Sequence, residues 1–127
     1  MYEEHIPGHW YDRALRDPWV IKDPESKGWL MFFTARVPDR CEANEGGAIG
    51  LATSDDLTHW QLQPPVFTGY FGQLEVPQDF EYGERWSQRY TESTAQHPVG
   101  GTHYLITSHP RAPGQWRPAL SLTVITQ

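Results

Sequence analysis

The stretch RALRDPWVIKDPE, from Arg13 to Glu25, carries two Asp-Pro pairs on either side of a short apolar run. Asp-Pro usually marks a turn, because the aspartate side chain bonds to nearby backbone and the proline presets its own φ. The first pair, Asp17-Pro18, instead leads directly into WVI at residues 19–21, which reads as a short strand whose direction the proline sets. The second pair opens DPESKG, residues 23–28, which is a turn by composition. The stretch therefore predicts a strand and a tight turn, and it raises the question of what Asp17 does at the start of that strand.

The segment that follows continues the β pattern. WLMFFTAR, residues 29–36, has apolar side chains on both faces and predicts a buried strand. AIGLAT at 48–53 is the next strand, SDDLT at 54–58 a turn, and HWQL at 59–62 a short outer strand. Short strands joined by tight turns predict an antiparallel meander.

The pattern then begins again. QLEV at 73–76 is a short strand interrupted by a proline and extended by residues 79–82, GTHYLIT at 101–107 is a clear strand, and residues 118–126 are β-rich. Residues 84–100 are too polar to be assigned as a strand. A repeat of about 40 to 50 residues, each a four-stranded meander, is typical of β-propeller blades. We therefore predict an all-β fold of antiparallel four-stranded meanders forming a partial β-propeller; the alternative is an ordinary small β-sandwich.

The boundaries follow from this repeat. Residues 1–127 are expected to form a single domain, as the length allows one core. Within it we expect an irregular segment at about 1–16, one blade at about 17–68, and the next blade with a β-rich tail at about 69–127. The 11 prolines and 11 glycines argue against long helices.

Composition limits the partners. A net charge of −6 argues against a nucleic acid or an anionic membrane surface, since both bind basic faces. Six Trp, six Tyr and five Phe on an acidic chain fit a neutral polyhydroxyl ligand better. We expect no cofactor, because there is no Gly-rich phosphate loop. We expect no metal, because the spaced histidines His97, His103 and His109 have no cysteine or carboxylate at ligand spacing.

The expected compartment is the cytoplasm. Cys41 is the single cysteine, so no internal disulfide forms, which suits a reducing compartment. The first residues, MYEEHIPGHWYD, have neither the basic stretch nor the apolar run of a signal peptide. No window approaches the 18 apolar residues of a membrane span.

Two carboxylates stand out when the repeat is taken into account. Asp17 precedes the first strand of one blade, and Glu75 lies at the start of the corresponding strand of the next, 75 − 17 = 58 positions later. Innermost strands line the central funnel of a propeller, so we expect both carboxyl groups to face one shared cavity. Singly, an Asp before Pro is usually a turn former and a strand Glu usually faces solvent. Together they suit sugar chemistry, in which an ionised carboxylate stabilises a cationic centre and a protonated one donates to the leaving oxygen.

Three motifs in order carry a family resemblance. Arg16-Asp17-Pro18, then IGLATSDDLTHW at 49–60, then GYFGQLEVPQ at 69–78, resemble invertase-like glycosidases, namely glycoside hydrolase family 32 and related five-bladed β-propeller glycosidases. The family commonly has Glu-Cys-Pro in its last motif, where this chain has Val76 in place of the cysteine. The likeness covers about residues 10–82 well and 83–110 weakly.

The resemblance implies roles for the candidate site residues. Asp17 would be the transition-state stabiliser that holds sugar hydroxyls, and Glu75 the general acid/base. Arg16 would bind substrate or orient a carboxylate through its planar guanidinium. Trp19 is a candidate platform for a sugar ring. The implied activity is that of a retaining hydrolase of glycosidic bonds.

One expected group is missing. The family's nucleophile is an Asp in an Asn-Asp-Pro-like motif on the first blade, and this sequence has no such motif. Asp12 is too near Arg16 to lie on another blade, and Asp23 lies in the turn of the same blade. Five blades need well over about 200 residues. The chain is expected to correspond to about two to three blades and to be inactive or weakly active alone.

Three functions therefore compete. The chain is part of an invertase-like enzyme, or a carbohydrate-binding or interaction module that lost the chemistry, or a structural remnant stabilised by self-association. Because a partial propeller exposes the flanks of its end blades, we expect a homodimer in each case.

Overall fold

The structure, a computed structural model, describes residues 15–37, 46–68, 73–93, 101–111 and 116–118. These residues form eight β-strands and contain no helix. No helix in this part of the chain is therefore long and apolar enough to cross a membrane. The strands are β1 (Arg16–Lys22), β2 (Trp29–Arg36), β3 (Gly47–Ser54), β4 (Gln61–Thr68), β5 (Gln73–Tyr82), β6 (Arg85–Ser93), β7 (Gly101–Thr107) and β8 (Arg117–Pro118).

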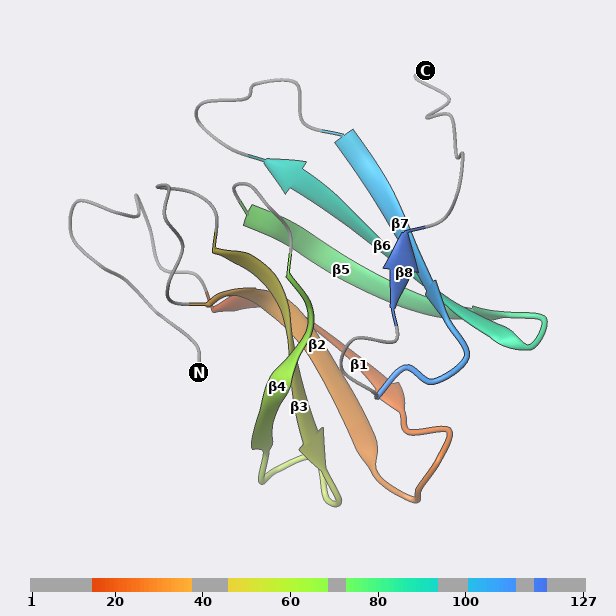
Figure 1. Ribbon diagram of the computed structural model, residues 1–127. Helices are drawn as coiled ribbons and strands as arrows, with labels where there is room; N and C mark the ends of the chain where they lie inside the picture. The colour runs from red at the N-terminus through yellow and green to blue at the C-terminus, as the bar shows by residue number, and fades with distance from the viewer. Residues whose placement is uncertain (1–14, 38–45, 69–72, 94–100, 112–115, 119–127) are drawn as a thin grey trace.

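The strands form two four-stranded sheets in which neighbours along the chain are neighbours in space. The first has the order β1-β2-β3-β4 and the second β5-β6-β7-β8, and every pairing is antiparallel. The two sheets pack face to face, with β1 and β2 against β5 (Figure 1). The predicted all-β fold of antiparallel four-stranded meanders is confirmed.

The strand β6 was not predicted, because its sequence, RWSQRYTES, is largely polar. Its burial nevertheless alternates with period two. Gln88 and Tyr90 are buried, whereas Arg89 and Thr91 are exposed. The alternation was hidden because one of the buried positions is a glutamine rather than an apolar residue.

The strand β4 is longer than the predicted 59–62 and includes two consecutive prolines. Pro64 and Pro65 lie where the register with β3 shifts, between the pairs Leu51↔Gln63 and Ile49↔Phe67. Proline cannot donate to a ladder, but it is tolerated at an irregularity of an edge strand, and β4 is such a strand.

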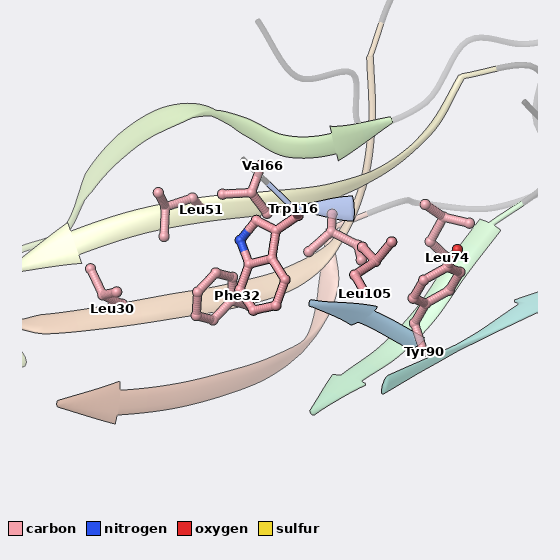
Figure 2. Packing of buried hydrophobic residues seen from close by; sticks show 9 residues of the cluster. Leu30, Phe32, Leu51, Val66, Leu74, Tyr90, Leu105 and Trp116 are labelled. Atoms are coloured by element: carbon pink, nitrogen blue, oxygen red, sulfur yellow. The ribbon is translucent and has the colours of Figure 1, made fainter. Parts of the chain in front are cut away.

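The core lies between the two sheets (Figure 2). Phe32 of β2 is fully buried and meets Trp116 edge to face, with ring centroids 6.0 Å apart at 85°. The indole N–H of Trp116 donates to the carbonyl of Pro110 at 3.0 Å, so the polar end of this buried side chain is satisfied. The buried members of the cluster are Leu30, Phe32, Ile49, Leu51, Val66, Leu74, Tyr90, Leu105 and Trp116.

The other face of the first sheet, which we call the outer face, carries a second apolar cluster. It consists of Phe33, Ala35, Val37, Ala48 and Ala52, with Met31 and Trp60 against them. A groove of about 310 Å³ runs along it. Leu15 and Leu62 line this groove with 46% and 55% of their surface exposed. In a complete propeller such a face is covered by the adjacent blade.

Candidate functional site

The first strand of each sheet contains the same local distortion. In β1 the register with β2 shifts between Arg16 and Trp19, and in β5 the register with β6 shifts between Glu75 and Gln78. Within each shift one residue that is not glycine has a positive φ: 57° at Asp17 and 53° at Val76. Each of these residues precedes a proline.

This shared backbone geometry shows which positions of the two repeats correspond. Asp17-Pro18 corresponds to Val76-Pro77, so Arg16 corresponds to Glu75, 59 positions apart. The sequence reading paired Asp17 with Glu75 at 58, which is one position out of phase. A spacing of 58 aligns the two acidic side chains, whereas a spacing of 59 aligns the two residues with positive φ.

The guanidinium of Arg16 lies between the two candidate carboxylates. Its Nη2 donates to Oε1 of Glu75 at 2.5 Å, and its Nε lies 3.7 Å from Oδ2 of Asp17. The three side chains are each roughly a third exposed, at 28%, 29% and 32% for Arg16, Glu75 and Asp17. The structure therefore brings together three of the four predicted site residues, at a partly open surface between the sheets.

Thr34 of β2 forms hydrogen bonds to both distorted segments. Its hydroxyl donates to Oδ2 of Asp17 at 3.2 Å and accepts from the backbone N–H of Val76 at 3.2 Å. Thr34 is fully buried. It contacts both distorted segments, and the sequence reading treated it only as part of a buried strand.

Trp19, the fourth predicted residue, links the same two strands further along. Its indole N–H donates to the backbone carbonyl of Asp79 at 3.0 Å, and the side chain is 38% exposed. The hydrogen bond orients the ring and leaves part of it accessible. Its role as a platform for sugar remains a prediction.

Asp79 is a buried carboxyl group that the sequence reading missed. The residue is 3% exposed, and Oδ1 accepts from Nε2 of Gln88 at 2.8 Å. Burial raises the pKa of Asp79 well above its ordinary value, and the hydrogen bond from Gln88 only partly opposes this. Among the described residues neither Oδ2 of Asp79 nor Oε1 of Gln88 has a hydrogen-bond partner. The signal available in the sequence was the alternation of β5, in which Asp79 follows Leu74 and Pro77 as an inward-facing residue.

The SDDLTHW segment forms a self-contained turn at the far end of the first sheet. Asp56 accepts from the backbone N–H groups of Thr58 and His59 at 2.8 Å and pairs with the His59 ring. These bonds, the backbone N–H of His59 first, lower the pKa of Asp56. The carboxylate is used to hold the turn, as expected of an Asx-type partner.

A polar cleft of about 340 Å³ lies at this same end, away from Arg16. Asp23 in its wall accepts from Ser26 at 2.7 Å and pairs with Arg111 at 3.0 Å. The cleft is larger than the groove on the outer face, but its charged groups are largely bonded to one another. We place the candidate site at Arg16, Asp17 and Glu75 instead, because there the charged groups are partly open. No group of three or more His, Cys, Asp or Glu in the described ranges is placed to hold a metal ion.

Comparison with known proteins identifies the fold. No family model matches the chain, and no curated protein matches it. Among solved structures, it superposes on an endo-arabinase from Bacteroides thetaiotaomicron with a TM-score of 0.63 and 24% identity, over 90% of this chain and 37% of that one. An inulosucrase from Halalkalicoccus jeotgali, bound to kestose, gives a TM-score of 0.69 and 23% identity over 84% of this chain and 30% of that one.

A third match is the catalytic domain of a β-fructofuranosidase from Microbacterium saccharophilum, with a TM-score of 0.67 and 17% identity, over 82% of this chain and 29% of that one. These neighbours are five-bladed β-propeller glycosidases. The chain has the fold of part of such a propeller. It spans about a third of the length of the structures that it matches. The two sheets are therefore blades, and the resemblance to this group of glycosidases, inferred from three motifs, extends to the fold.

Proposed function

We propose that the chain is the carbohydrate-contacting part of a β-propeller of the glycoside hydrolase family 32 type, with Arg16, Asp17 and Glu75 as the ligand-binding cluster. The observation that carries the proposal is the convergence of two carboxylates on one guanidinium, at matching distortions of adjacent first strands. Similar structures bind such ligands: one neighbour holds kestose and another, a β-xylosidase/α-arabinofuranosidase, holds xylotriose.

The three side chains offer complementary chemistry to a sugar. Asp17 accepts hydrogen bonds from vicinal hydroxyls, and the guanidinium of Arg16 donates to ring or hydroxyl oxygens. Glu75 is bonded to Arg16 through Oε1, which is the arrangement of an acceptor. To act as the general acid, its carboxyl would have to leave this ion pair and take up a proton. Binding of a polyhydroxyl ligand is therefore the direct capability of this arrangement, and acid catalysis needs a rearrangement.

Hydrolysis by the chain alone is not expected. A retaining mechanism uses two carboxyl groups roughly 5–5.5 Å apart, one attacking the anomeric carbon and one protonating the leaving oxygen. Asp17 accepts from Thr34 and lies beside Arg16, which suits holding hydroxyls rather than attack. Proton transfer contributes only about 10²–10⁴-fold, so an acid and a stabiliser without a nucleophile give little turnover.

The test is isothermal titration of the 127-residue chain with sucrose, kestose and inulin, alongside an assay for released fructose. We expect weak, saturable binding that Asp17→Asn reduces at least tenfold, with little or no release of sugar. Asp55→Asn is the matched control, because it makes the same change at an exposed site outside the cluster. Absence of any binding refutes the proposal. Rapid release abolished by Glu75→Gln shows instead an active enzyme with a nucleophile elsewhere, and Asp12, outside the described residues, is the first to replace.

A second candidate is a self-associating module without catalysis, and the outer face of the first sheet favours it. The groove there is lined almost entirely by apolar groups, including Leu15, Met31 and Leu62. An apolar sheet face of this kind packs against another sheet in propellers and sandwiches. On this view the chain forms a homodimer in solution.

A further inference from the structure

We infer that Thr34 is the positioning residue of the proposed site, because its hydroxyl holds Asp17 and the backbone beside Glu75 in a fixed relation across the two blades. The inference rests on the proposed function, since it concerns the same two carboxylates. It adds a residue that the sequence motifs did not indicate.

The two segments that Thr34 joins are strained on their own. Asp17 and Val76 have φ values of 57° and 53°, in the left-handed region that residues with a Cβ rarely adopt. Each also precedes a proline, which further disfavours compact backbone conformations. Such residues persist only where the surroundings determine them, so a specific partner is required.

Neither distorted residue has a partner in the strand register of its own sheet. Val76 lies inside the register shift between Glu75↔Thr91 and Gln78↔Arg89, so it has no partner residue on β6. Asp17 lies inside the corresponding shift of β1. The bond from Val76 N–H to Oγ1 of Thr34 replaces the missing ladder bond, and Glu75 is the residue immediately before it.

Thr34 is suited to this task by its position and its chemistry. It lies on β2, which pairs with β1 on one side and β3 on the other, and it is fully buried. A hydroxyl has one proton to donate and can also accept, so its one proton serves Asp17 and its oxygen serves Val76. A rigid central strand thus sets both distorted segments, and through them the geometry around Arg16.

Two substitutions separate the hydroxyl from the shape of the side chain. Thr34→Val keeps the shape and removes the hydroxyl, whereas Thr34→Ser keeps the hydroxyl and removes a methyl group. The measured quantity is the coupling between Arg16 and Glu75, from the unfolding free energies of Arg16→Gln, Glu75→Gln and the double variant in each background. We expect Thr34→Val to reduce this coupling by at least half and Thr34→Ser to preserve it.

The same backgrounds are titrated with kestose, where we expect Thr34→Val to weaken binding at least tenfold and Thr34→Ser to retain it. Failure of the unchanged protein to bind kestose overturns the proposed function alone, because the coupling measurement needs no ligand. A coupling that is equal in the Thr34→Val and unchanged backgrounds overturns the role of Thr34, whatever the sugar result. If Thr34→Val does not fold, hydrogen exchange on the unchanged protein decides: we expect the Val76 amide to be protected, and exchange at the rate of an unstructured peptide refutes the inference.

Discussion

Replacing Asp79 by asparagine should stabilise the protein increasingly as the pH rises. In the ionised form, Oδ2 of Asp79 and Oε1 of Gln88 are two buried acceptors, and neither has a hydrogen-bond partner among the described residues. A proton on Oδ2 would supply the donor for Oε1 of Gln88 and give a pair of hydrogen bonds between acid and amide. The amide nitrogen of an asparagine supplies the same donor at every pH.

The size of the effect follows from the two oxygens. A buried polar group without a partner costs about 1–3 kcal/mol, and the new hydrogen bond relieves this cost. We therefore expect Asp79→Asn to raise the free energy of unfolding by about 1–3 kcal/mol where the carboxyl would otherwise be ionised. Where the carboxyl is already protonated, the substitution should change little.

The sign of the pH dependence is fixed by the direction of the pKa shift. The pKa of Asp79 is raised in the folded protein, so between the unfolded value of about 3.9 and the folded value the native state binds more protons. The contribution of Asp79 to stability is thus fully present below about pH 3.9 and is lost as the pH rises through the folded pKa. Asp79→Asn removes this loss of stability, so the free energy of unfolding of the variant should exceed that of the unchanged protein by more as the pH rises.

The assay is urea unfolding followed by tryptophan fluorescence at each pH unit from 4 to 8. Asp55→Asn is the control, because it makes the same chemical change at an exposed position. The difference in unfolding free energy between the variant and the unchanged protein cancels the contributions of titratable groups that both contain. One such group is Asp56, whose pKa is lowered. A uniform destabilisation of Asp79→Asn at every pH would refute the reasoning, because it would mean that the carboxylate is satisfied as it stands.

Two further predictions concern the outer face of the first sheet. Gly50→Ala should lower the free energy of unfolding by about 1–3 kcal/mol, because its Cβ would overlap the Phe33 ring. The urea midpoint measures this loss, and a smaller loss in the Phe33→Leu background would confirm the contact. Leu62→Glu should shift the chain toward monomer in light scattering at tens of micromolar, because it places a charge beside the apolar groove, while the unchanged chain should be dimeric. A strictly monomeric unchanged chain would remove the case for self-association.

The fold was accessible from the sequence because the turns and the buried strands carry strong local signals. WLMFFTAR and the Asp-Pro turn placed β2 and its hairpin, and the repetition of short strands indicated blades. The strand β6 was missed because a buried Gln88 breaks its apolar alternation, and the hydrogen bond that explains this glutamine is the one it donates to Asp79 on another strand. Such pairings depend on register, which a single sequence does not display.

The sequence indicated which residues belong to the candidate site, but it indicated less of how they are arranged. The Arg-Asp-Pro and Glu-Val-Pro motifs brought Arg16, Asp17 and Glu75 into consideration, and the structure brings all three together. The role of Thr34 was not accessible, because a threonine within a buried strand is ordinary. What distinguishes it is contact with two distorted segments whose sequence positions are far apart.

The matching positions of Arg16 and Glu75 affect which blade can dock beside which. Two modules with one backbone plan could, in principle, exchange neighbours, and a sheet could dock beside a copy of itself. Here the corresponding position carries a cationic side chain, Arg16, in the first sheet and an anionic one, Glu75, in the second. A first sheet placed beside another first sheet would set arginine against arginine, and two second sheets would set glutamate against glutamate. The ion pair between Arg16 and Glu75 therefore favours docking of a first sheet beside a second sheet, and it disfavours docking of two identical sheets.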